Sequence, residues 1–319
     1  MIKHSKMKIT VIMPVYNGES TIEKTLVGLL VQSKKFDELI VIDDGSKDRS
    51  VERLKNFLDG RMDYNLIQNE KRLGLAAGYN RGIKSAKGDL IVTLHQDIIL
   101  EKDSLEKLVE PFHDKKVVAA SHIVSHPLEV WNKYNFWQKS FFGRLAGKDF
   151  SGIDGKFDAF RKSALEKAGL FDDKHFHTAG EDGDMVFKLK KMGKIADTEA
   201  RIIHLHKVDP NFSWKDIVHK QAQYSEAQGV LLALGRIRNL ETFGRSFFRE
   251  LMLLALVVPY LNIVSLISIA LYSFLYTKII FEKNYKDKRI FILSLFNIFL
   301  LFVSSFYSLR GFIYGKQRI

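Results

Sequence analysis

The sequence predicts an α/β protein with a mostly parallel central sheet, followed by long apolar helices. The first observation is that short β-branched runs alternate with segments of helical spacing between residues 9 and 94. This alternation is typical of a parallel sheet with helices on both faces. The second is a pair of runs without any charged residue, Leu251 to Thr277 and Ile290 to Leu309. Each is at least as long as the roughly 18–20 residues that cross the hydrocarbon core of a bilayer.

The expected strands are rich in Ile, Val and Leu and are separated by amphipathic helices. The strands are expected at Ile9 to Met13, Leu39 to Ile42, Tyr64 to Gln68, Leu90 to Leu94, Val117 to Val124 and Arg201 to Leu205. The helices are expected around Ile22 to Leu30, Leu54 to Leu58, Leu73 to Ala86, Lys162 to Ala168 and Trp214 to Leu234. Trp131 to Phe142 is rich in aromatic residues and lysine, which is typical either of a core or of an interfacial or substrate-lining segment.

Polar or small residues follow three of the expected strands: Tyr16-Asn17-Gly18, Asp43-Asp44-Gly45-Ser46 and His95-Gln96-Asp97. In open α/β sheets, ligands bind beyond the carboxyl ends of the strands, so these turns are expected to face a ligand. The chain has neither a Gly-rich dinucleotide fingerprint after its first strand nor a phosphate loop ending in Gly-Lys-Ser/Thr, which argues against hydride transfer and ATP hydrolysis. It has no cysteine, which excludes a thiol nucleophile and a Cys-ligated metal.

The positive charge of the chain gathers around its apolar runs. The formal net charge is +12, and the residues from Glu241 onward contain ten Lys/Arg against four Asp/Glu. Basic residues that flank apolar runs indicate membrane attachment, and the absence of a basic helix face with interleaved aromatic residues argues against nucleic acid as a partner. We therefore expect a front domain at residues 1–235 and an anchor at residues 236–319, with membrane helices at about 247–281 and 289–312.

The number of membrane crossings stays open. Pro259 and Asn262 interrupt the first apolar run, which is either one kinked helix or a short re-entrant pair. If both runs span, the basic loop from Lys278 to Arg289 lies opposite the front domain, contrary to the positive-inside rule for a cytosolic front domain; if the first run returns, the rule holds. The apolar run from Ile9 to Val15 is too short for a secretory signal and is expected to be a strand.

An acidic stretch, Gly180-Glu181-Asp182-Gly183-Asp184, precedes an apolar run of helical spacing. A carboxylate near the start of a helix is well placed to take a proton from an incoming hydroxyl. Acidic residues in a first helical turn also simply complement the helix dipole, and both interpretations stay open on these residues alone.

Six stretches of the chain occur in the order typical of one enzyme family. They are VIMPVYNGESTIEKTL, LIVIDDGSKDRSVE, NEKRLGLAAGYNRGIKSAKGDLIVTLHQD, AFRKSALEKAGLFDD, GEDGDMVFKLKKMG and RIIHLHK. The chain thereby resembles the family 2 glycosyltransferases from about Ile9 to Gly229. These are inverting enzymes with the nucleotide-sugar-binding GT-A fold, and their membrane-anchored members carry C-terminal hydrophobic helices. The resemblance implies that residues 1–235 form the catalytic domain.

The resemblance also implies which residues bind the nucleotide-sugar donor: Pro14, Tyr16, Asn17, Glu19, Asp43, Asp44, Arg72, Gly74, Asn80 and Gln96. The carboxylates of Asp43 and Asp44 suit a ring N–H or a ribose hydroxyl, although an Asx turn with Gly45 would use the same residues. Arg72 and Arg81 are candidates to face phosphate.

His95-Gln96-Asp97 stands where the family usually has an Asp-x-Asp motif that holds a divalent metal on the diphosphate. Of the two acids only Asp97 is retained, with His95 in the first position, as in rhamnosyltransferase-like variants. The resemblance implies that His206, with His204 as the second choice, completes the site together with Asp97. The expected cofactor is Mn²⁺ or Mg²⁺, and an imidazole ligand would favour Mn²⁺.

Asp182 matches the catalytic base of the family, and Glu181 is expected to orient that base or the acceptor, as is Asp184. The implied reaction transfers a hexosyl or deoxyhexosyl group to a lipid-linked or growing glycan acceptor in polysaccharide or glycoconjugate biosynthesis. The implied location is the membrane, among membrane lipids, with a cytoplasmic catalytic domain and a homo-oligomer left open. Two alternatives remain: a polyprenyl- or dolichyl-phosphate sugar synthase, and a catalytically inactive nucleotide-sugar-binding membrane protein.

Overall fold

The computed structural model describes residues 7–284 and 286–318, which form two compact units. The first unit contains the chain up to residue 127 together with residues 147–177 and 181–207. The second contains residues 128–146, 178–180 and 208 onward. The expected division after residue 235 does not coincide with these units, because segments 128–146 and 208–235 group with the helices that follow them.

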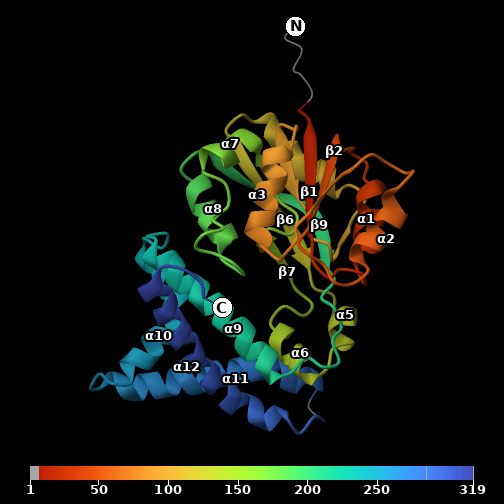
Figure 1. The fold of residues 1–319 in the computed structure, drawn as a ribbon. Helices are drawn as coiled ribbons and strands as arrows, with labels where there is room; N and C mark the ends of the chain where they lie inside the picture. Colours follow the sequence, from red (N-terminus) through yellow and green to blue (C-terminus); the bar gives the residue numbers. More distant parts are fainter. Residues whose placement is uncertain (1–6, 285, 319) are drawn as a thin grey trace. The chain divides into compact units, whose positions relative to one another are not determined.

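The first unit is built on one mixed sheet (Figure 1). Its described strands are β1 (Ile9–Val15), β2 (Glu38–Asp43), β3 (Asn65–Gln68), β4 (Leu90–Thr93), β5 (Ile98–Leu100), β6 (Val117–Ser125), β7 (Asp149–Gly152), β8 (Ala159–Arg161) and β9 (Lys194–His204). Their order is β3-β2-β1-β4-β8-β6-β9-β5, and β7 pairs with β6. The half formed by β3, β2, β1 and β4 is parallel, as the alternating sequence predicted. In the other half β8 runs antiparallel to β4 and β6, while β6 and β9 are parallel.

Helices cover both faces of the parallel half, which explains its continuous apolar strands. In β1, Val11 and Met13 pack into a core with helices α1 (Ile22–Leu30) and α2 (Ser50–Leu58). Ile12 between them points to the opposite face, because successive side chains of a strand alternate. That second core includes residues of α3 (Leu75–Ser85), α7 (Lys162–Lys167) and α8 (Glu181–Leu189). A short helix α4 (Ser104–Val109) and a 3₁₀ turn, η1 (Glu110–His113), precede β6. The predicted α/β class is confirmed.

The second unit is helical. It contains α5 (Leu128–Asn132), α6 (Phe136–Phe142), α9 (Trp214–Ala233), α10 (Leu240–Ala255), α11 (Leu261–Asn284) and α12 (Ile290–Tyr314). The aromatic segment of α5 and α6 packs in a core with Ile280, Ile290 and Leu293, so its core interpretation holds for Trp131 and Phe136. Helices α9 and α12 cross closely at two glycines, which lack a Cβ. A Cβ on Gly229 would clash with the Ser308 carbonyl, and one on Gly311 would clash with the Glu226 carbonyl.

Replacing Gly311 with alanine is expected to destabilise the second unit. The added methyl group meets backbone atoms of α9 that cannot rotate away, so the cost should reach at least about 1–3 kcal/mol, the usual range for overpacking. Gly244→Ala in α10 is the matched control, because a Cβ there meets nothing within 4 Å and alanine favours a helix by about 1 kcal/mol. Thermal unfolding in detergent should show a lower Tm for Gly311→Ala alone. An unchanged Tm would contradict the close crossing.

Among the residues that the structure describes, two helices are long and apolar enough to cross a membrane: Leu261–Glu282, with a mean hydropathy of 1.8, and Ile290–Tyr314, with 2.2. The first expected apolar run is divided between the end of α10 and the start of α11. Pro259 and Tyr260 lie in the turn between them, and Tyr260 has a φ of 67°, which a continuing helix does not allow. The first long apolar helix therefore begins at residue 261 rather than near 247.

Candidate functional site

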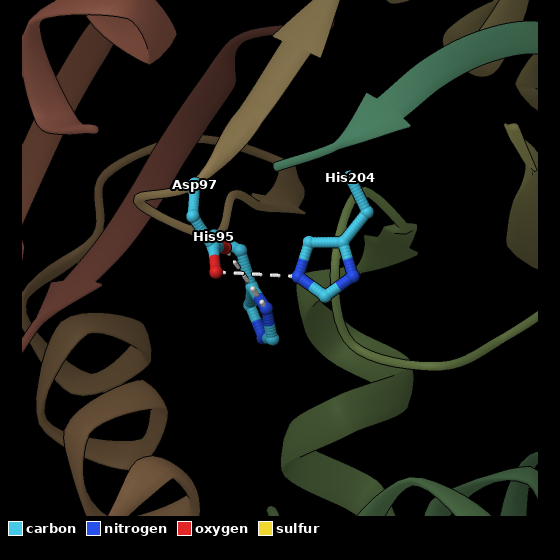
Figure 2. Close-up of side chains that lie close together, drawn as sticks. All are labelled: His95, Asp97 and His204. Atoms are coloured by element: carbon cyan, nitrogen blue, oxygen red, sulfur yellow. Dashed lines mark hydrogen bonds and ion pairs between the residues drawn. The ribbon is translucent and has the colours of Figure 1, made fainter. Parts of the chain in front are cut away.

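Three of the residues that follow β4 or end β9 come together in the first unit (Figure 2). Asp97 Oδ2 lies 3.2 Å from His204 Nε2, and Asp97 Oδ1 lies 3.9 Å from His95 Nδ1. The potential ligand atoms of these three side chains all lie within 4.8 Å of one another. Antiparallel pairing of β5 with β9 brings them together, since Ile98 is opposite His204 and the Leu205 N–H donates to the Asp97 carbonyl at 2.7 Å.

The donor set of this cluster suits a divalent transition metal. Burial lowers the pKa of His95 to about 4, so the ring is neutral near pH 7, as a metal ligand must be. Burial opposes ionisation of Asp97, but the hydrogen bond from His204 and the neighbouring imidazoles prevail and lower its pKa to about 2. His95 Nε2 and His204 Nδ1 are buried and have no hydrogen-bond partner among the described residues. One carboxylate and two imidazoles therefore fit Mn²⁺ better than Mg²⁺, which prefers oxygen ligands throughout.

His206 lies beside this cluster rather than in it. Its ring is 3.9 Å from that of His204 and stacks on His126 with the ring centroids 5.7 Å apart. Burial lowers the pKa of His206 to about 2 and that of His126 to about 4, so both rings are neutral. The histidine that the structure brings to Asp97 is therefore His204, which the sequence ranked second. His126 was not anticipated, because nothing in the sequence marks the end of β6 as a neighbour of β9.

Glu181 and Asp182 open helix α8, where the acidic stretch was expected to begin a helix. Burial, with the charge of Asp182 added to it, raises the pKa of Glu181 to about 7. Burial also raises the pKa of Asp182, and the nearby carboxylates of Asp154 and Asp158 act in the same direction. A carboxylate with a raised pKa is a stronger proton acceptor near neutral pH. Asp184, in contrast, is fully buried and forms an ion pair of 2.6 Å with Lys188, so it has a structural partner.

The loop between β7 and β8 belongs to the site and was not assigned from the sequence. Asp154 Oδ2 pairs with Lys156 Nζ at 2.5 Å. The buried Asp158 carboxylate accepts the backbone N–H groups of Asp154 and Gly155 at 3.1 and 2.7 Å and contacts His122 Nδ1 at 3.0 Å. His122, Asp154 and Asp158 form a second group of potential ligand atoms. The only available signal was three charged residues within the five from 154 to 158.

Most of the expected nucleotide-binding residues shape the turns beyond the strands. Gln96 holds the backbone of Tyr16 with two hydrogen bonds of 3.0 Å, and Arg72 lies 4.4 Å above the Tyr16 ring. The Asn17 carboxamide accepts the Lys47 N–H, and Glu19 accepts the Arg49 N–H.

Further expected residues lie on or against α3. Asn80 is buried and bonds through both amide atoms to the backbone of Phe171. Pro14 lies beside Gly78, and Gly74 adopts a φ of 95° just before α3 begins. Arg81 donates to the Asn69 side chain.

Asp43 and Asp44 have different surroundings at the end of β2. Asp43 Oδ1 accepts the Ser46 N–H at 3.2 Å, so it closes the turn, as the alternative interpretation proposed. Asp44 Oδ1 accepts from the Asn69 amide and from the Leu73 N–H, both at 2.8 Å, and its Oδ2 accepts from the Gly74 N–H at 2.9 Å. Asp44 therefore anchors the segment that leads into α3.

Replacing Asp44 with alanine is expected to destabilise the first unit. Three donors would lose their acceptor, and each buried donor left unsatisfied costs about 1–3 kcal/mol. The exposed Asp63, changed to alanine, is the matched control. Asp44→Ala should lower the Tm and increase hydrogen exchange at residues 69–74, whereas equal exchange in both variants would contradict the anchoring role.

Comparisons with known proteins agree on one family. The profile described as glycosyl transferase family 2 matches residues 10–169, and that of glycosyl transferase family group 2 matches residues 90–303. An uncharacterized glycosyltransferase of Haemophilus influenzae is 40% identical over 99 residues, which is 31% of this chain and 40% of that protein. The poly-beta-1,6-N-acetyl-D-glucosamine synthase of Staphylococcus aureus is 31% identical over 178 residues, which is 51% of this chain. The match spans 42% of the length of that synthase.

Two solved structures share the fold. A mannosyltransferase from Pyrobaculum calidifontis, in complex with GDP-Man and Mn²⁺, superposes with a TM-score of 0.60 at 16% identity and covers 96% of this chain and 88% of its own. The structure of GalNAc-T7 with UDP, GalNAc and Mn²⁺ gives a TM-score of 0.50 at 17% identity and covers 71% of this chain and 51% of its own. The likeness confirms the predicted GT-A fold.

Proposed function

The chain belongs to glycosyl transferase family 2, and we propose that it is an inverting glycosyltransferase that moves a sugar from a nucleotide-sugar donor to a lipid-linked or growing glycan acceptor. One observation carries this proposal. The loop at residues 154–158 is hydrogen-bonded to His95, whose N–H donates to the Lys156 carbonyl at 2.9 Å, and the charges of its Asp154 and Lys156 act on the pKa of Asp182. A proton acceptor and a cluster suited to a diphosphate-bound metal thus share one neighbour.

In the proposed reaction, Asp182 accepts the proton of the acceptor hydroxyl while the oxygen attacks the anomeric carbon. The bond from that carbon to the diphosphate oxygen breaks as the new C–O bond forms, and the nucleoside diphosphate leaves with the bonding electrons. Attack from the face opposite the leaving group inverts the anomeric centre, so no carboxylate nucleophile is required. A divalent cation held by Asp97, His95 and His204 would supply positive charge to the diphosphate. Glu181 keeps the proposed role of orienting Asp182 or the acceptor.

We further propose that α11 and α12 attach the protein to the membrane, with the catalytic unit in the cytoplasm. Large apolar side chains along α12 support this proposal, because Phe291 is 77% exposed and Leu295 is 71% exposed. Such exposed apolar surface is typical of contact with lipid. Attachment would hold the catalytic unit near an acceptor that is itself anchored in lipid. The sugar is proposed to be a hexose or deoxyhexose, and the His95 variant of the metal motif keeps a rhamnosyltransferase-like donor among the candidates.

A donor screen tests the proposed function. UDP-, GDP- and dTDP-sugars are added to the detergent-solubilised protein with Mn²⁺, Mg²⁺ or EDTA, and the Tm is measured. A ligand that binds only the folded state increases the free energy of unfolding by about 2.7 kcal/mol at 100 times its Kd. The Tm rises as a consequence. Consumption of the stabilising donor in the presence of a membrane extract is the expected second result. Binding without consumption would favour the inactive binding protein, and no binding of any donor would contradict the proposal.

A further inference from the structure

The pairing of β4 with β8 continues beyond the ends of both strands. Leu90 is opposite Arg161 and Val92 is opposite Ala159. The same register is kept by the Thr93 N–H, which donates to the Asp158 carbonyl, and by the His95 N–H, which donates to the Lys156 carbonyl, both at 2.9 Å. Lys156 is therefore directly opposite His95. Directly opposite residues of an antiparallel pair place their side chains on the same face, about 4.5–5.5 Å apart at Cβ.

Buried side chains fix the backbone of the loop that carries Lys156. The Asp158 carboxylate accepts two backbone N–H groups of the loop, and the hydroxyl of buried Tyr79 donates to the Gly155 carbonyl at 2.8 Å. Fixing the backbone on both sides of residue 156 lowers the entropy lost when its side chain meets a ligand. The side chain itself is 20% exposed, so a ligand can reach it.

The Lys156 ammonium is the group of this loop that suits a phosphate. The Lys156 ammonium has three N–H donors, and its partner among the described residues is Asp154. The ammonium therefore has N–H donors left for a ligand, and it lies on the same face of the strand pair as His95. Such a group suits phosphate oxygens, which accept strong charge-assisted hydrogen bonds.

We propose that Lys156 binds the diphosphate of the nucleotide, so that the site retains nucleoside diphosphates without a divalent metal. Asp154 competes with the phosphate for the same ammonium and so limits this affinity. The inference rests on the proposed function, because it assumes that a nucleoside diphosphate occupies the site.

The test is calorimetric titration of UDP and GDP into the full chain in detergent, in EDTA and again in Mn²⁺. The wild type should bind one of the two nucleotides in EDTA. Lys156→Met should weaken that binding about tenfold or more, as expected for losing a charge-assisted hydrogen bond, whereas Lys156→Arg should retain it. Asp154→Asn should strengthen it, which a merely structural role of this pair would not produce. Lys102→Met, at an exposed position in the same unit, should leave the affinity unchanged.

Two results would overturn the inference while leaving the proposed function intact. The first is a wild type that binds UDP or GDP in Mn²⁺ but not in EDTA. The second is equal affinity of wild type and Lys156→Met in EDTA, with Tm values showing that the variant is folded. Should Lys156→Met fail to fold, the comparison of Asp154→Asn and Lys156→Arg with the wild type decides. Failure of the wild type to bind either nucleotide, with or without Mn²⁺, would overturn the inference, whereas the proposed function falls only if the donor screen, which also includes dTDP-sugars, shows no binding.

Discussion

Asp182→Asn is expected to lower kcat by about 100- to 10,000-fold, the contribution of a positioned general base. The amide keeps the size of the carboxylate at the start of α8 but cannot take the proton of the attacking hydroxyl. Binding of the donor should be nearly unchanged, because the loss concerns proton transfer rather than the nucleotide turns. The expected effect is therefore on kcat, with little change in the donor KM.

The raised pKa of Asp182 gives this prediction a pH dependence. A base must be deprotonated, and burial favours its protonated form, so activity should fall as the pH decreases through the raised pKa. Burial and the charge of Asp182 raise the pKa of Glu181 to about 7, so the acid limb of the pH–rate profile reports both carboxyl groups. Glu181→Gln removes the second group of the pair, so the acid limb should then follow a single ionisation, that of Asp182.

The control for Asp182→Asn is Glu52→Gln, which neutralises an exposed acid in the first turn of α2. If the acids at the start of α8 only complement the helix dipole, both variants should lose little activity. Near-wild-type turnover of Asp182→Asn on a phosphate acceptor alone, such as a polyprenyl phosphate, would have a different meaning: the nucleophilic oxygen of that acceptor is already ionised and needs no base. Rates on a hydroxyl acceptor and on a polyprenyl phosphate, measured for the same preparation, separate these cases.

Asp97→Asn is expected to have the second largest effect, on metal binding and on every activity that needs the metal. Asp97 is the carboxylate of the cluster and contacts both imidazoles, so its loss removes the anionic ligand and the partner that orients His204. Loss of an orienting partner alone typically costs 10- to 100-fold in metal affinity, so at least about 100-fold is expected here. Electron paramagnetic resonance of free Mn²⁺ measures that affinity directly, without an assay of turnover.

Three variants complete this experiment. His204→Ala should weaken Mn²⁺ binding more than His206→Ala, because His204 lies 3.2 Å from Asp97 whereas His206 stacks on His126. Asp103→Asn, which neutralises a surface acid paired with Lys107, should not affect it. The opposite order of the two histidines would restore the assignment that the sequence favoured, and equal Mn²⁺ affinity of Asp97→Asn and wild type would exclude this cluster as the metal site.

Local pattern predicted much of the first unit correctly. Alternating apolar runs predicted β1 to β4 and the helices between them, because strand and helix periods are properties of neighbouring residues. The same holds for the acidic start of α8 and for the long apolar helix α12. These features depend on residues within a few positions of one another, so the sequence alone determined them.

Only the tertiary structure decided how distant segments meet. The register of β5 against β9 places His204 against Asp97, and the continuation of the β4–β8 pairing places Lys156 opposite His95. The three hydrogen-bond donors to the Asp44 carboxylate also come from another part of the chain, residues 69 to 74. Such pairings depend on hydrogen bonds between strands far apart in sequence, and a slip of one residue would turn each side chain to the other face. No pattern within a single segment records that register.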